Sequence, residues 1–279
     1  MINRKKFIRQ LMLGTASTIS FPALSKASFV YAPKKSTALN IGIAGYTFAH
    51  FSVDEAISMM KRMDIHYISL KDFHLPLDSP AEKIKEVLDK FNAANIKVYT
   101  LGVIYMKTQQ AVDEAFDYAK RVGVDMIVGV PTYELLDYTE QKVKSTNIKI
   151  AIHNHGPEDK LYPAPQNVME HISKRDERMG LCLDIGHATR AGADLVKTIK
   201  DYKNRLFDLH IKDVTSADNN GKAIEIGRGI INFKALVEAL NKVGYKGICS
   251  IEYEKDMKDP LPGLAESEGF FKGVINTVA

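Results

Sequence analysis

The sequence predicts a single (β/α)8 barrel over residues 39–279. Apolar runs rich in Ile, Val and Leu alternate with stretches of helical period, and eight such runs occur. This alternation is typical of a parallel sheet covered by helices, because strands buried on both faces are almost continuously apolar. The number of repeats and the length of the segment match a closed barrel, and a content of 45% apolar residues is sufficient for its core.

The expected strands, in chain order, are residues 39–46, 66–70, 96–104, 124–130, 148–154, 179–184, 206–211 and 247–253. The expected helices are residues 53–63, 81–94, 109–122, 133–146, 164–174, 193–203 and 233–243. Start signals support three of them: Ser52 with Glu55 three residues later, Ser79 with Pro80, and Asn232. Residues 260–279 form either the eighth helix or a segment that packs on a neighbouring subunit of a homo-oligomer.

An open, doubly wound sheet is the alternative fold. Such sheets usually carry a glycine-rich turn for a nucleotide phosphate after the first strand, and Gly42-Ile43-Ala44-Gly45 lacks the required spacing. The chain also contains no Walker-type phosphate loop and no Gly-x-Ser-x-Gly motif. The sequence therefore favours the barrel and gives no support for nucleotide binding.

Residues 1–27 have the composition of an export signal. A basic head at residues 4–9 precedes a stretch of apolar and small residues at 11–24, and Ser25-Lys26-Ala27 resembles a cleavage site. Residues 3–9 are similar to a twin-arginine signal with lysine in place of the second arginine, and ordinary secretion is the alternative. We expect residues 28–38 to be a linker and the protein to be exported, to the periplasm, without membrane association once the signal is removed.

The net charge of the chain comes from this leader. Five positive charges and no acidic residue lie in residues 1–27, so that removing the leader changes the formal charge from +4 to −1. A basic balance indicates nucleic-acid binding only when it belongs to the folded domain. We therefore expect no nucleic-acid partner.

Two cysteines in an exported protein could form a disulfide, but their positions argue against it. Side chains alternate along a strand, so that Cys182 shares a face with Asp184 whereas Cys249 lies on the face opposite Glu252. If both acids point to the barrel interior, the two thiols lie in different layers. We expect both cysteines to be free core residues.

Four of the apolar runs end in residues that bind divalent metals. A charged group at the end of a buried strand is costly unless it is paired, and the carboxyl ends of barrel strands meet at one face. A shared metal ion is the simplest partner for all four, although a single His is often a core residue and an Asp often caps the next helix. The runs end in His153-Asn154-His155, Asp184-Ile185-Gly186-His187, His210-Ile211-Lys212-Asp213 and Ile251-Glu252, which supply the candidate ligands.

Several motifs at these strand ends resemble those of the xylose-isomerase-like barrel superfamily, which includes sugar epimerases, inosose dehydratases and an abasic-site endonuclease branch. The resemblance covers about residues 39–255. The motifs that carry it are Asp184-Ile185-Gly186-His187-Ala188, His210-Ile211-Lys212-Asp213, Ile251-Glu252 and Gly227-Arg228-Gly229.

The resemblance implies one divalent metal held by residues on strands five to eight, which here are His153, Asp184, His210 and Glu252. The family usually has Glu where this chain has His153. Two imidazoles and two carboxylates suit zinc or manganese best, with cobalt, iron and, less favourably, magnesium as alternatives.

The change at His153 bears on the mechanism that the resemblance implies. Family epimerases use acids on strands five and eight as paired proton carriers, and here only Glu252 remains. Single-base chemistry beside a metal-polarised ketone or hydroxyl is therefore favoured, giving an isomer or an eliminated alkene. Glu252, His155 and Lys212 are the predicted catalytic residues. The predicted contacts to a sugar or keto-sugar substrate are His187, Asp213, Arg228, Lys71 and Tyr46.

Two other functions are consistent with the sequence. The endonuclease branch needs additional metal ligands, and the third strand ends in Gly102-Val103-Ile104-Tyr105 without one. A non-catalytic, sugar-binding barrel would retain the metal for stability only. The leading hypothesis is an exported, metal-dependent isomerase, epimerase or lyase that acts on a small carbohydrate.

Overall fold

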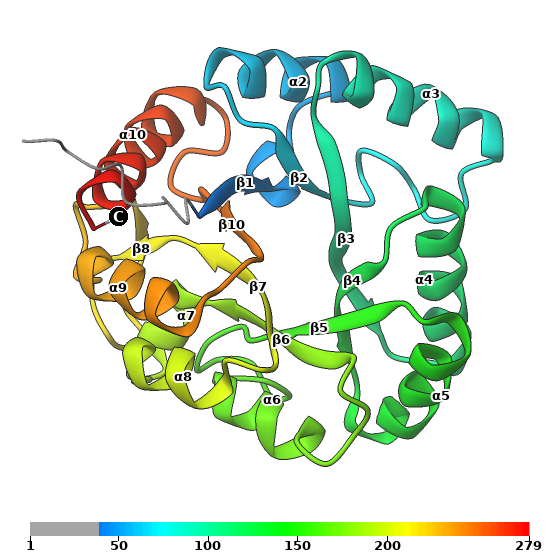
Figure 1. Ribbon diagram of the computed structural model, residues 1–279. Coiled ribbons are helices and arrows are strands. Elements are labelled where there is room, and N and C mark those ends of the chain that lie inside the picture. The colour runs from blue at the N-terminus through cyan, green and yellow to red at the C-terminus, as the bar shows by residue number, and fades with distance from the viewer. Residues whose placement is uncertain (1–38, 279) are drawn as a thin grey trace, which may run out of the picture. The chain divides into compact units, whose positions relative to one another are not determined.

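The computed structural model describes residues 39–278 and shows a closed barrel of eight parallel strands (Figure 1). Around the barrel the strands follow the order β1-β10-β7-β6-β5-β4-β3-β2. Their bounds are β1 (Asn40–Ala44), β2 (Tyr67–Leu70), β3 (Lys97–Met106), β4 (Met126–Pro131), β5 (Lys149–His153), β6 (Met179–Asp184), β7 (Leu206–Ile211) and β10 (Ile248–Ile251). The barrel predicted from the sequence is confirmed, and the open sheet is excluded.

Helices cover the outside of the barrel (Figure 1). They are α2 (Val53–Arg62), α3 (Ala81–Ala93), α4 (Gln109–Val122), α5 (Leu136–Thr146), α6 (Pro165–Ile172), α7 (Ile185–Arg190), α8 (Leu195–Tyr202), α9 (Phe233–Val243) and α10 (Leu261–Val278). The C-terminal stretch thus forms a helix, α10. It packs on α9, because the Phe233 ring lies 6.0 Å from the rings of both Phe270 and Phe271.

Some short elements were not expected from the sequence. Helix α7 follows β6 directly, and the antiparallel pair β8 (Asp213–Val214) and β9 (Ala223–Ile224) lies between β7 and α9. A 3-10 turn, η1 (Gly45–Phe48), follows β1, and a second one, η2 (Tyr133–Leu135), precedes α5. Elements of two to six residues are too short to show a hydrophobic period, so that the pattern cannot reveal them.

A buried polar layer lies inside the barrel between β3, β7 and β10. The hydroxyl of Tyr99 donates to Asp208 Oδ2 at 2.9 Å and lies 2.6 Å from Ser250 Oγ. Burial raises the pKa of Asp208 to about 7.

Cys182 and Cys249 are buried and free, as expected.

The start of α2 has the capping box predicted from the sequence. The Ser52 hydroxyl accepts from the Glu55 amide, and the Glu55 carboxylate accepts from the Ser52 amide at 2.8 Å. We expect Ser52→Ala to lower the free energy of unfolding by about 1 kcal/mol, as measured by urea denaturation. Ser58→Ala, at an exposed position within the same helix, is the control and should be nearly neutral; equal effects of the two changes would contradict a capping role.

The predicted export signal (1–27) and linker (28–38) lie outside the described residues. Within residues 39–278, no helix combines the length and apolar character that crossing a bilayer requires.

Candidate metal centre and substrate pocket

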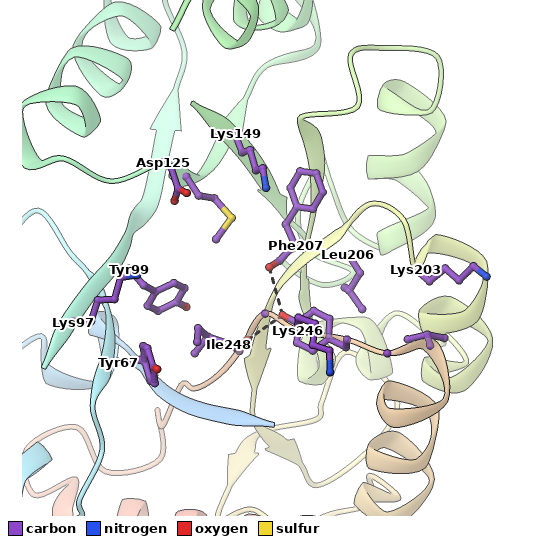
Figure 2. Close-up of a pocket in the computed structure, with 15 residues that line it drawn as sticks. Tyr67, Lys97, Tyr99, Asp125, Lys149, Lys203, Leu206, Phe207, Lys246 and Ile248 are labelled. Atoms are coloured by element: carbon purple, nitrogen blue, oxygen red, sulfur yellow. Dashed lines mark hydrogen bonds between the residues drawn. The ribbon is translucent and has the colours of Figure 1, made fainter. Parts of the chain in front are cut away.

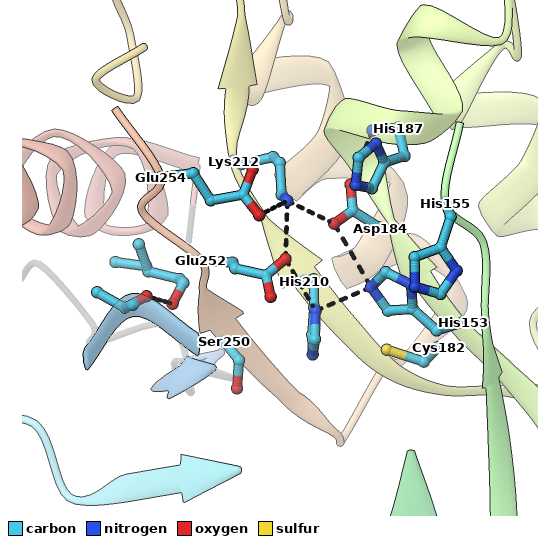
Figure 3. A network of polar contacts seen from close by, with 12 residues as sticks. His153, His155, Cys182, Asp184, His187, His210, Lys212, Ser250, Glu252 and Glu254 are labelled. Carbon is cyan, nitrogen blue, oxygen red and sulfur yellow. Dashed lines mark hydrogen bonds and ion pairs between the residues drawn. The ribbon is translucent and has the colours of Figure 1, made fainter. Parts of the chain in front are cut away.

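The four predicted ligands come together at the carboxyl ends of β5, β6, β7 and β10 (Figure 3). Ligand atoms of His153, Asp184, His210 and Glu252 all lie within 4.8 Å of one another. The four residues are at most 6% exposed. Barrel closure therefore brings together side chains that are about 100 residues apart along the chain.

The arrangement of these atoms fits a divalent metal. His153 Nε2 lies 3.0 Å from His210 Nδ1 and 3.6 Å from Asp184 Oδ2, and His210 Nδ1 lies 3.3 Å from Glu252 Oε2. Two ring nitrogens at this distance are compatible in two cases. Either one carries a proton and donates it to the lone pair of the other, or both lone pairs bind a common cation. Two imidazoles and two carboxylates are a donor set that suits zinc, manganese, cobalt or iron.

The charge state of the centre follows from its burial. Burial holds the pKa of His153 well below its ordinary value, so that the ring is neutral and able to donate a lone pair. Burial alone would raise the pKa of Glu252, but Lys212 and His210 outweigh it and hold the pKa far below the usual range. The centre therefore presents ionised carboxylates at neutral pH.

Lys212 lies among the carboxylates of this centre (Figure 3). Its ammonium is 3.1 Å from Asp184 Oδ2, 2.7 Å from Glu252 Oε2 and 3.1 Å from Glu254 Oε1, and the side chain is 3% exposed. Burial alone would lower the pKa of Lys212, but the three carboxylates raise it well above the ordinary value. Lys212 is therefore a fixed positive charge that can stabilise a developing oxyanion, and it is not a free base.

Asp184 uses its two oxygens for different purposes. Oδ1 accepts from the His187 amide at 2.8 Å and caps α7, while Oδ2 faces His153 and Lys212. Asn154 fixes the backbone here, because its side chain donates to the Asp184 carbonyl and accepts from the Asp184 amide, each at 3.0 Å. The helix cap weighed from the sequence is present at Asp184, and its role as a metal ligand stays a prediction with which the position of Oδ2 is compatible.

A cavity of about 340 Å³ opens directly above the centre. It is lined by Tyr46, Lys71, Val103, Tyr105, His153, His155, His187, Glu252 and Glu254. A second cavity, of about 470 Å³, lies at the amino ends of the strands, where Lys97, Lys149 and Asp125 are among the lining residues (Figure 2). None of the four predicted ligands lines that second cavity, whereas His153 and Glu252 line the cavity at the carboxyl face.

Comparison with known proteins identifies the family of the chain. Residues 104–273, more than half of the sequence, match the family described as xylose isomerase-like TIM barrel. The chain belongs to this family. The resemblance noted at the strand ends is thereby confirmed.

Two curated proteins are similar to part of the chain. An uncharacterized protein of Methanocaldococcus jannaschii is 33% identical over 35% of this chain and 33% of its own length. The inosose dehydratase of Lacticaseibacillus casei is 30% identical over 29% of this chain and 32% of its own length. The matched part thus spans about a third of these relatives.

Solved structures of the family share the whole barrel. A protein of Parabacteroides distasonis is 26% identical, with a TM-score of 0.66 over 85% of this chain and 99% of that one. IolI protein with a bound zinc atom is 17% identical, with a TM-score of 0.70 over 86% and 99%. At this identity the second likeness shows the fold alone.

The residues predicted to contact substrate fall into two groups. Tyr46, Lys71, His155 and His187 line the upper cavity. His155 contacts Tyr105, since its Nε2 lies 2.9 Å from the Tyr105 hydroxyl. Burial lowers the pKa of His155, so that the ring is neutral. Substrate contact by Tyr46, Lys71 and His187 stays a prediction that their position supports, and so does the predicted catalytic role of His155.

Asp213 and Arg228 do not line that cavity. Asp213 is fully buried, and its carboxylate accepts from the amides of Gly227 and Gly229 at 3.0 and 2.9 Å. Arg228 is half-exposed and pairs with Glu266 on α10. The structure therefore shows Asp213 organising the loop before α9, and Arg228 lying on the outer surface of this loop. The Gly227-Arg228-Gly229 motif supplies amides rather than a guanidinium to the carboxyl face.

Glu254 was not identified from the sequence. It lines the cavity and contacts Lys212. The signal was present, since Glu254 lies two residues after Glu252 and side chains of an extended chain alternate, so that the two acids share a face.

The partly buried imidazole of His187 makes stability depend on pH. Burial lowers its pKa to about 4 from the ordinary 6.5. Unfolding restores the ordinary pKa, so that the unfolded chain binds more protons between these values and the fold loses stability as pH falls. We expect His187→Gln to remove about 1.5 kcal/mol of the decrease in unfolding free energy between pH 6.5 and pH 5, measured by urea denaturation. An identical decrease in wild type and variant would contradict this assignment.

Proposed function

We propose that the protein is an exported, metal-dependent isomerase, epimerase or lyase that acts on a sugar or keto-sugar. One observation carries the proposal: His153, Asp184, His210 and Glu252 form a buried quartet at the carboxyl face, and two of its members, His153 and Glu252, line a cavity there. Family relatives described as inosose dehydratase and L-ribulose 3-epimerase support this class of reaction. The zinc in the IolI structure supports a divalent metal.

A metal in this quartet would polarise a carbonyl or hydroxyl of the substrate and acidify the adjacent C–H bond. Glu252 is ionised and at the cavity floor, so it is placed to take up that proton. The Lys212 ammonium is placed to stabilise negative charge on the substrate oxygen. Neutral His155, at the cavity wall, is placed to exchange a second proton.

The cavity suits a small, hydroxyl-rich molecule. Its lining combines charged groups and imidazoles with the rings of Tyr46 and Tyr105, which are 42% and 50% exposed and can stack on a sugar face. The volume of about 340 Å³ is within the range of small-molecule sites. The composition of residues 1–27 supports export, which cell fractionation of the full chain tests.

The experiment is incubation of metal-analysed protein with a panel of sugars and 3-keto-sugars in heavy water, followed by NMR. Deuterium incorporated at one carbon would support an isomerase or epimerase, and loss of a substituent would support a lyase. Binding without exchange, with every divalent metal of the first transition row supplied, would indicate the non-catalytic barrel and contradict the proposal.

A further inference from the structure

We propose that Lys212 competes with the divalent metal for Asp184 and Glu252, and that Glu254 holds the ammonium when the metal is bound. The inference rests on the proposed metal-dependent function and concerns how strongly the site holds its ion. Lys212 and Glu254 would together set the metal affinity without being ligands.

The divalent metal and the Lys212 ammonium need the same carboxylate oxygen atoms. Asp184 Oδ2 lies 3.6 Å from His153 Nε2 and 3.1 Å from the Lys212 ammonium. Glu252 Oε2 lies 3.3 Å from His210 Nδ1 and 2.7 Å from the same ammonium. A metal bound by the two imidazoles and these two oxygens would therefore lie within a few ångströms of a positive charge. Either the ammonium moves away from these oxygens or the site binds the metal more weakly.

Lys212 has one carboxylate partner outside the quartet as well as two within it. Its buried ammonium lies at ion-pair distance from Asp184, Glu252 and Glu254. Glu254 offers a way out of the centre, because it contacts the ammonium at 3.1 Å, lies outside the quartet and is 27% exposed at the cavity. A shift of Lys212 toward Glu254 would free Asp184 and Glu252 while keeping the charge paired.

The absence of a side chain at Gly186 leaves space for the Lys212 side chain. A Cβ atom built on Gly186 would overlap the Lys212 side chain at Cγ and Cδ. The glycine in the Asp184-Ile185-Gly186-His187 motif therefore allows the lysine stem to pass α7 and reach Asp184. Any larger residue at position 186 would push the ammonium away from the metal ligands.

The experiment is a double-mutant cycle on metal affinity. Binding of Zn²⁺ and of Mn²⁺ is measured at one pH by competition with a chromophoric chelator, for the wild type, K212M, E254Q and K212M/E254Q. We expect K212M to bind metal at least about tenfold more tightly than wild type. We expect E254Q to bind it roughly fivefold more weakly, because the Lys212 ammonium then has no carboxylate partner outside the quartet. In the K212M background, E254Q should change affinity less than about twofold.

K71M is the matched control, since Lys71 lines the same cavity but pairs with Asp72 and the Val103 carbonyl rather than with a ligand. It should leave metal affinity within about twofold of wild type. If K212M does not fold, G186A replaces it and should also tighten metal binding.

Three results would overturn the inference. K212M or G186A binding metal no more tightly than wild type would show that the lysine does not compete. E254Q weakening metal equally in both backgrounds would show that Glu254 acts by its own charge. Equal tightening by K71M would show a general charge effect. A wild-type protein that binds neither ion would instead refute the metal-dependent function itself.

Discussion

Replacing Glu252 by Gln is expected to lower turnover and substrate deuterium exchange by about 10³-fold. The amide has nearly the same shape but cannot accept a proton, and Glu252 is 6% exposed and lines the cavity. Turnover of whichever sugar the panel identifies is measured together with metal content, so that loss of proton transfer is separated from loss of metal.

Glu238→Gln is the control for this change. Glu238 lies on α9 with its side chain 55% exposed and 4.0 Å from Lys234, far from the carboxyl-face cavity lining. Its replacement should leave turnover unchanged. Wild-type turnover in metal-loaded Glu252→Gln would refute the assignment of Glu252 as the base.

Asp184→Ala is expected to have the largest combined effect on metal binding and stability. The change removes one predicted ligand, one partner of the buried Lys212 charge and the cap of α7. We expect metal affinity to fall at least about 100-fold and the free energy of unfolding to fall by about 3 kcal/mol or more. Chelator competition and urea denaturation measure the two effects.

Asp184→Asn separates these effects. The amide oxygen can still accept from the His187 amide and fill the same volume, so that this variant should retain more stability than the Ala variant while still losing metal affinity. Wild-type affinity in both variants would show that Asp184 is not a ligand, and equal stability of both variants would show that the cap contributes little.

The fold could be predicted because each barrel strand is buried on both faces and each helix on one. Those two patterns have different periods, and their alternation leaves few architectures. The convergence of His153, Asp184, His210 and Glu252 followed from the same reasoning, since the carboxyl ends of parallel strands in a closed barrel face one side.

The remaining features of the site depend on chain paths beyond the strands. Asp213 follows Lys212 directly and so points to the opposite face, where backbone amides surround it. The path of the loop that supplies these amides is not encoded in any hydrophobic period. The direction of Lys212 into the quartet depends on the space left at Gly186, a contact between the first turn of α7 and the end of β7 that no sequence pattern encodes.

The polar layer beneath the centre has a consequence for the order of folding. Tyr99 is 109 residues from Asp208 and 151 from Ser250 in the chain, so that their contact requires the first half of the polypeptide to meet the last. Contacts of such high sequence separation carry a large loop-closure cost and tend to form late. We therefore expect the phenol of Tyr99 to become buried only when the barrel closes, whereas the quartet above it lies on the consecutive neighbouring strands β5, β6, β7 and β10 and does not require that closure.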